Sequence, residues 1–182
     1  MSLITLAELK TYLGIVSSSD DTILQNCINA SKAIIENYTS RYFESRTETR
    51  YFAWERGDEI LLDQDLLQLN SLVLDSVTIP PADIVLLPKN SEAKTKIKLK
   101  NFYYPSDLDA AFWEVSGSWG FSAQVPADIK MACTRLAAFL YRQKDSQVFD
   151  VTAMPEVGQI VIPQGIPKDV MIQIKPYRRY LV

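Results

Sequence analysis

The sequence predicts an α+β protein, a small helical bundle formed by the two ends of the chain with an antiparallel β subdomain inserted between them. Apolar residues recur at intervals of three and four near both ends, as in amphipathic helices. Between these ends, short apolar runs alternate with turn residues such as Gly57-Asp58 and Pro80-Pro81. A chain of 182 residues is long enough for one core that carries an inserted subdomain. We therefore expect residues 1–46 and 121–182 to form the helical core with a C-terminal tail, and residues 47–120 the β subdomain.

A short first helix is predicted by a capping box at Thr5 and Glu8, whose side chains can each satisfy the other residue's exposed backbone amide. Gly14 can adopt the left-handed conformation that ends a helix. The apolar side chains between these signals share one face: Leu6, Leu9 and Leu13.

A longer second helix is expected after Asp20 or Asp21, either of which can cap its N-terminus. A wide apolar stripe runs along it: Ile23, Leu24, Cys27, Ile28, Ser31, Ile34, Ile35 and Tyr38. Such a stripe forms part of a core far more often than it forms a ligand site.

After about residue 47 the pattern changes to short β runs separated by turns. The expected strands cover residues 49–54, 59–62, 72–74, 77–79, 84–87, 95–99 and 112–115. Strands at such close spacing predict a small antiparallel sheet or a barrel-like insert.

Helical spacing returns at Pro126, which suits a first helical position, and Asp128 favours the positive end of a helix. The stripe of this helix contains small residues that permit close packing: Ile129, Ala132, Cys133, Leu136, Ala137 and Leu140. Residues 146–165 form a long connection in which residues 159–162 can be extended. A last helix is expected over residues 168–174. Because Pro176 disfavours helix at Lys175, we expect an extended tail from there.

The composition argues against an enzyme. The chain contains no histidine, which removes the commonest general base and metal ligand. Cys27 and Cys133 fall on apolar helix stripes and are expected to be buried thiols. Asp63 and Asp65 have D-x-D spacing without the glycine-centred loop of a calcium site. We therefore expect no catalytic, metal or cofactor site.

A basic stretch stands out in a chain of net charge −3: Lys94, Lys96, Lys98 and Lys100 alternate along one predicted strand. Alternate residues point to the same face of a sheet. The simpler interpretation is an edge strand whose lysines prevent edge-to-edge pairing. The other is a strip that binds nucleic acid, with stacking from the aromatic residues 102–104.

The N-terminus lacks the pattern of a signal peptide and no apolar run is long enough to span a membrane, so we expect a cytoplasmic protein.

Three segments resemble tailed-phage head–tail connector proteins, also called adaptor or head-completion proteins. They are ITLAELKTYLGI with DDTILQNCINASKAIIENYTSRYF, then SGSWGFSAQVPADIKMACTRLAAFLYRQKDS, then IPKDVMIQIKPYRRYLV. They cover the N-terminal and C-terminal thirds in the family's order. The central β insert resembles that of the β-containing variants of the family.

The resemblance implies a structural protein of the virion neck, assembled in the host cytoplasm without membrane contact. Such proteins form a ring, typically of twelve subunits, beneath the portal protein. They extend the DNA channel and dock the next stopper or tail-completion protein. DNA is then only passing cargo, and a lumen without lysines would let it slide, so we expect residues 94–100 to face away from the lumen.

Two segments are candidates for contacts with the portal or a neighbouring subunit. Tyr and Arg side chains anchor interfaces most often, and the tail carries several: Pro176, Tyr177, Arg178, Arg179 and Tyr180. A tail that packs on its own domain remains an alternative. The long connection supplies apolar anchors: Met154, Val157, Ile160 and Ile162. Two other functions stay open, another neck or tail-completion subunit and a nucleic-acid-binding module that uses the lysine strand.

Overall fold

The chain divides into two compact units in a computed structural model that describes residues 3–105, 111–144 and 165–179. The helical unit comprises Met1–Thr39 and Pro126–Arg178, and the β unit comprises Ser40–Val125 and Arg179–Val182. The chain therefore leaves the helical unit, returns to it, and ends in the β unit.

Helix α1 (Leu6–Leu13) begins and ends where its capping signals predict. The Thr5 backbone amide donates to Glu8 Oε2 at 2.6 Å, and the Glu8 amide donates to Thr5 Oγ1 at 3.2 Å. Gly14 ends the helix with φ 71°, a left-handed conformation that a residue with a Cβ adopts only at a cost. The capping box and the glycine stop are confirmed.

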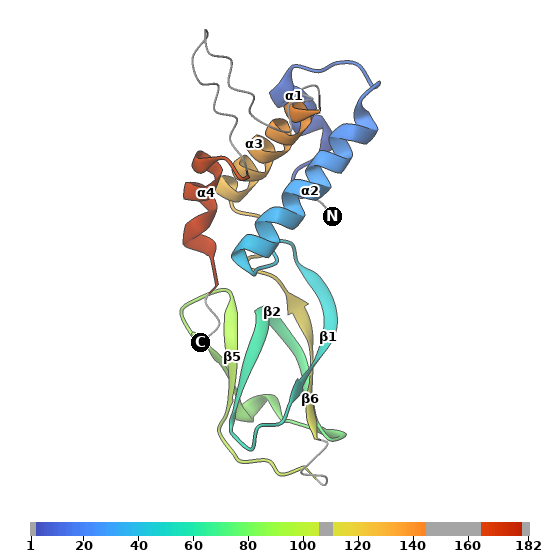
Figure 1. Ribbon diagram of the computed structural model, residues 1–182. Helices are drawn as coiled ribbons and strands as arrows, with labels where there is room; N and C mark the ends of the chain where they lie inside the picture. The colour runs from blue at the N-terminus through green and yellow to red at the C-terminus, as the bar shows by residue number, and fades with distance from the viewer. Residues whose placement is uncertain (1–2, 106–110, 145–164, 180–182) are drawn as a thin grey trace. The chain divides into compact units, whose positions relative to one another are not determined.

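Helix α3 (Ala127–Gln143) is the centre of the helical unit and packs against α1, α2 (Asp21–Thr39) and α4 (Lys168–Ile174) (Figure 1). Its buried side chains are mostly small, which allows close helix packing. The core includes Leu9, Leu24, Ile28, Ile35, Ile129, Ala132, Cys133, Leu136, Ala137, Val170 and Ile174. Cys133 is buried, Cys27 is partly buried, and both thiols are free. None of the described helices is long and apolar enough to cross a membrane.

The tail prediction is wrong at its start. A 3₁₀ turn, Lys175–Tyr177, continues directly from α4, and the extended backbone begins only at Arg178. Proline removes a backbone donor but has a φ that suits a 3₁₀ turn. The turn is also held from outside, because the Tyr177 hydroxyl donates to Asp128 Oδ2 at 2.7 Å.

Six strands form one antiparallel sheet in the described part of the β unit, in the order β1-β6-β2-β5-β4 with β3 beside β2 (Figure 1). Their bounds are β1 Arg46–Ala53, β2 Glu59–Leu74, β3 Val77–Thr78, β4 Ile84–Leu87, β5 Lys94–Leu99 and β6 Phe112–Trp119. A 3₁₀ turn, Pro81–Asp83, precedes β4. The α+β fold class is confirmed.

Strand β2 joins two predicted strands into one of 16 residues, and its register with β5 and β6 shifts at irregularities. Gly117 of β6 sits against one of these irregularities. A Cβ at this position would lie 2.3 Å from the Gln68 carbonyl oxygen and 2.8 Å from Leu66 Cδ1. The glycine therefore permits the close approach of β2 and β6.

The β unit has an apolar core formed mainly by its strands. It comprises Trp54, Ile60, Leu62, Leu66, Leu72, Leu74, Ile79, Ile97, Leu99, Trp113, Val115 and Trp119. The Trp119 indole donates to the Glu48 carbonyl oxygen at 3.0 Å, and its ring stacks on Phe52. A buried indole needs such a partner for its N–H group.

Candidate interaction surfaces

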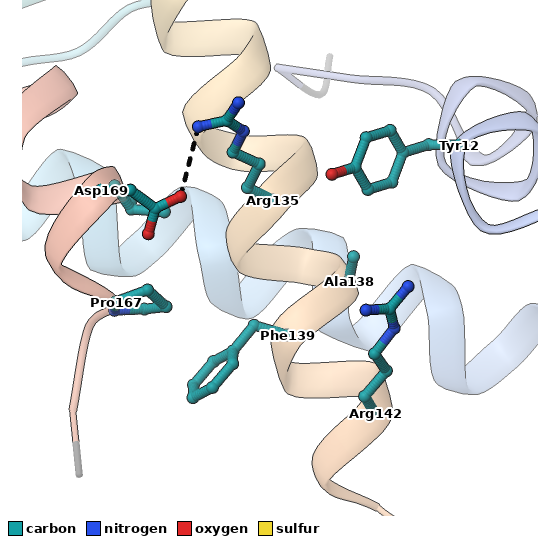
Figure 2. Close-up of a pocket in the computed structure, with 8 residues that line it drawn as sticks. Tyr12, Arg135, Ala138, Phe139, Arg142, Pro167 and Asp169 are labelled. Carbon is teal, nitrogen blue, oxygen red and sulfur yellow. Dashed lines mark hydrogen bonds and ion pairs between the residues drawn. The ribbon is translucent and has the colours of Figure 1, made fainter. Parts of the chain in front are cut away.

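A pocket of about 410 Å³ opens beside α3 in the helical unit, and we call it the α3 pocket (Figure 2). Side chains from α1, α3 and the start of α4 line it: Tyr12, Arg135, Ala138, Phe139, Arg142, Pro167, Asp169 and Val170. Phe139 and Pro167 are among its apolar lining, while Tyr12 and the arginines add polar groups. An apolar hollow with a few polar groups is suited to the side chains of a partner.

The two arginines of the α3 pocket differ in their partners. Arg135 Nη1 lies 3.2 Å from Asp169 Oδ2, so its charge is largely balanced within the unit. Arg142 makes no ion pair with the described residues, and its guanidinium group lies at the pocket (Figure 2). The pocket therefore carries positive charge that the described chain leaves uncompensated.

A second surface lies where α1 ends. Ile15 and Val16, which we call the valine turn, follow the Gly14 cap, and the side chain of Val16 is 96% exposed. A single exposed apolar residue is common on proteins. Val16 is nevertheless the most exposed of the large apolar side chains among the described residues.

The valine turn belongs to a connection that ion pairs hold in place. Lys10 Nζ lies 2.6 Å from Asp21 Oδ1, and Lys144 Nζ lies 2.6 Å from Asp20 Oδ2. The Tyr141 hydroxyl also donates to Asp20. The hydrogen bonds from Lys144 and then Tyr141 lower the pKa of Asp20 below its usual value.

In the described part of the C-terminal tail, the residues up to Arg178 belong to the helical unit and Arg179 belongs to the β unit. Pro176 and Arg178 are exposed, and the Arg178 guanidinium lies 5.6 Å from the centre of the Tyr38 ring. Tyr177 is partly buried, and burial followed by its hydrogen bond to Asp128 raises its pKa to about 12. Tyr180 lies outside the described residues.

Arg179 is held inside the β unit. Its side chain is only 7% exposed; it donates to the Leu62 carbonyl oxygen, and Nη1 lies 3.5 Å from Oδ1 of the fully buried Asp65. Arg41 Nη1 contacts the other oxygen of Asp65 at 2.5 Å. Arg179 is thus less accessible to a partner than Pro176 and Arg178. The other sequence candidates, Met154, Val157, Ile160 and Ile162, lie outside the described residues.

The family of the chain is decided by its match to a family model. The model for "head completion protein" matches residues 2–180. The chain belongs to the head completion protein family. The resemblance to connector and head-completion proteins is therefore confirmed. No match was found among curated protein sequences.

Solved structures with the fold of this head completion protein come from gene transfer agent (GTA) particles. A chain from the neck of an empty particle computed with C6 symmetry has a TM-score of 0.69 and 23% identity, and the match covers 99% of this chain and 91% of that one. A chain from the virion of a native particle gives 0.68 and 22%, with coverage of 99% and 91%. A chain from the native neck computed with C12 symmetry gives 0.65 and 23%, covering 97% and 89%. At this identity the likeness establishes the fold.

The lysine strand of this head completion protein is not an edge strand, so that prediction is wrong. Strand β5 lies between β2 and β4 in the sheet. Its lysines have partners inside the β unit: Lys96 Nζ lies 2.7 Å from Glu59 and Lys98 Nζ 3.2 Å from Glu59. Lys94 and Lys100 donate to backbone carbonyl groups. Asp58 precedes β2 and Glu59 begins it, and their carboxylates pair with lysines of β5. This pairing explains the alternating lysines better than edge protection does.

Two exposed aromatic pairs on the β unit are further candidates for contact. Phe102 and Tyr104 have ring centroids 5.0 Å apart, and Tyr51 of β1 meets Phe112 of β6 at 5.5 Å. All four rings are exposed. Tyr51 and Phe112 lie on neighbouring strands whose register only the structure supplies, so this pair could not be predicted from the sequence.

The titratable groups of the described residues show no assembled reaction centre. No group of three or more His, Cys, Asp or Glu side chains in residues 3–105, 111–144 and 165–179 could hold a metal ion. The lowered pKa values of Asp20, Glu59 and Asp83 all follow first from hydrogen bonds to a lysine or tyrosine side chain. Such shifts accompany ordinary structural pairs.

Proposed function

We propose that the chain is a structural, non-enzymatic component of the neck of a tailed phage or GTA particle. It forms a ring beneath the portal protein, extends the DNA channel, and presents a docking surface to the next stopper or tail-completion protein. The observation that carries this proposal is the head completion family model, which spans residues 2–180. A structural role of this kind needs repeated subunit contacts rather than a reaction centre.

The fold adds support for a ring in the virion neck. Chains with this fold come from neck structures computed with C6 and C12 symmetry, and each match covers nearly all of this chain. A cyclic ring requires two different, complementary surfaces on each subunit. The subunit number and the neighbours in the ring are part of the proposal.

The electrostatics favour this function over nucleic-acid binding. The four lysines of residues 94–100 are engaged with carboxylates and carbonyl groups of their own unit. Asp58 and Glu59 therefore balance the charge of Lys96 and Lys98, and carbonyl groups hold Lys94 and Lys100 to their own unit, so fewer of the lysines are available for contacts with phosphates. We place this strand away from the lumen of the ring. No observation favours another neck subunit over the ring beneath the portal.

Pro176 and Arg178 are our candidates for the portal contact, with Tyr177 beside them and Tyr180 beyond the described residues. Pro176 and Arg178 are exposed, and Arg178 lies at the point where the backbone becomes extended. Arginine is a frequent interface anchor. Arg179 instead serves to attach the tail to the β unit.

Deletion of the gene from the phage or GTA genome tests the function. We expect DNA-filled heads that fail to join tails, and restoration of joining when the intact chain is supplied from a plasmid. Electron microscopy of the particles is the measurement. Normal, tailed particles in the absence of the chain would contradict the proposal.

A further inference from the structure

We propose that the valine turn of one copy inserts into the α3 pocket of the neighbouring copy, and that this is a contact between subunits of the ring. The inference rests on the proposed function, because it assigns the surfaces that hold copies together. It uses only the helical unit, which contains both surfaces.

The valine turn has the rigidity that a preformed contact needs. The Ile15 amide donates to the Lys10 carbonyl oxygen at 3.0 Å and the Gly14 amide to Thr11 at 3.3 Å, so the chain is fixed up to the valine. The ion pairs of Asp20 and Asp21 fix the residues that follow. A rigid loop loses little conformational entropy when it binds.

The α3 pocket complements this turn in chemistry and charge. Its volume of about 410 Å³ and its partly exposed apolar side chains, Phe139 and Pro167, suit aliphatic groups such as those of Ile15 and Val16. The turn also brings with it the carbonyl end of α1, where the helix dipole is negative. The Arg142 guanidinium, unpaired among the described residues, can donate to these carbonyl groups.

The two surfaces lie on different flanks of α1, which favours a contact between copies. At about 100° per residue, Tyr12 of the α3 pocket lies about 140° around the helix from Ala7 and about 160° from Lys10. Ala7, Lys10, Thr11 and Gly14 line a shallow hollow together with Ile15 and Val16, and Val16 is 96% exposed there. Because this surface and the α3 pocket are formed by different residues, copies can join head to tail in the arrangement that closes into a ring.

Cysteine cross-linking in assembled particles tests the contact. The test variant combines Val16→Cys and Phe139→Cys with Cys27→Ser, and it keeps Cys133, which is buried. After mild oxidation, we expect a ladder of dimers and higher multimers of the chain on a non-reducing gel. The matched control replaces Phe139→Cys by Met131→Cys, which is exposed on the same helix but does not line the pocket, and it should give no ladder.

The outcomes separate this inference from the proposed function. If the chain is present in the necks but the ladder is absent, or if the cysteine at position 16 links to a different particle protein, the inference is overturned. If the chain is absent from the particles, the proposed function fails as well.

Val16→Asp should fold normally, since the side chain is exposed, and lower the yield of tailed particles about tenfold or more. Val77→Asp on the β unit is its control, and an equal loss in both variants would also overturn the inference.

Discussion

Asp65 is a carboxylate with no exposure to water, and two arginines face it. Arg41 contacts one oxygen at 2.5 Å and Arg179 approaches the other at 3.5 Å. Buried charges are tolerated only when paired, because desolvation of an unpaired ion costs several kcal/mol. Burial lowers the pKa of Arg179, and the nearby carboxylate of Asp65 opposes this effect. The carboxylate is therefore what permits two guanidinium groups to lie here.

Replacement of Asp65 by asparagine is expected to destabilise the β unit. Asp65→Asn leaves both guanidinium groups without their counter-ion and should lower the free energy of unfolding by about 3 kcal/mol or more. Urea unfolding followed by tryptophan fluorescence measures this unit, because Trp54, Trp113 and Trp119 all belong to it. The matched control is Asp63→Asn, which removes an ion pair of a 59% exposed carboxylate and should cost less than about 1 kcal/mol. Equal effects of the two changes would disprove the assigned role.

The role of these two aspartates could not be predicted from the sequence. The D-x-D spacing shows that the two carboxylates are close together but not which arginines meet them, since Arg41 and Arg179 lie far away along the chain. The capping box at Thr5 and Glu8 was predictable because its partners are three residues apart. Local pairs can be read from a sequence, whereas pairs formed by the fold require the structure.

At the scale of elements, the connection from α1 to α2 is anchored to the end of α3 by Asp20, Tyr141 and Lys144. The same hydrogen bonds raise the pKa of Lys144 and of Tyr141 and lower that of Asp20. Because the folded state lowers the pKa of Asp20, the stabilisation it provides is present above the usual pKa of an aspartate. It is lost as the pH falls through the lowered value.

Asp20→Asn should therefore change the acid response of the helical unit. We expect the variant to have a lower Tm than the parent at pH 7, and the difference to shrink as the pH falls below about 4. Thermal unfolding monitored by circular dichroism at the helix band provides the measurement. A difference that stays constant from pH 7 to pH 2 would show that the charge of Asp20 does not support the connection.

The helices were predictable as elements, but the sheet was only partly so. Apolar periodicity and capping residues place α1 and α4 at the expected bounds, and α3 begins one residue after Pro126. Residues 63–71 hid the continuity of β2, because polar residues interrupt its leucines and the register shifts break the regular alternation of a strand. The prediction that β5 is an edge strand was wrong for a related reason. The order of strands depends on which strands pair, and the sequence of one strand does not show its neighbours in the sheet.

At the scale of the whole molecule, the tail supplies a test of the proposed portal contact. Arg178→Glu reverses the charge of an exposed side chain, so the free energy of unfolding should change by less than about 1 kcal/mol. Joining of tails to heads should fall strongly if Arg178 anchors the portal. Counting tailed particles by electron microscopy gives the readout. Lys89→Glu, an exposed charge reversal on the β unit, serves as the control and should leave joining unchanged. Normal joining with Arg178→Glu would remove Arg178 from the portal contact.

The partition of the chain at Arg179 has a practical consequence for dissecting the protein. Residues 40–125 look like a self-contained fragment for expression, yet they lack the guanidinium group that the chain's far end contributes. Such a fragment would expose the Leu62 carbonyl and leave Asp65 with Arg41 alone. A synthetic peptide that carries Arg179 should consequently restore the stability of the fragment when it is added in trans.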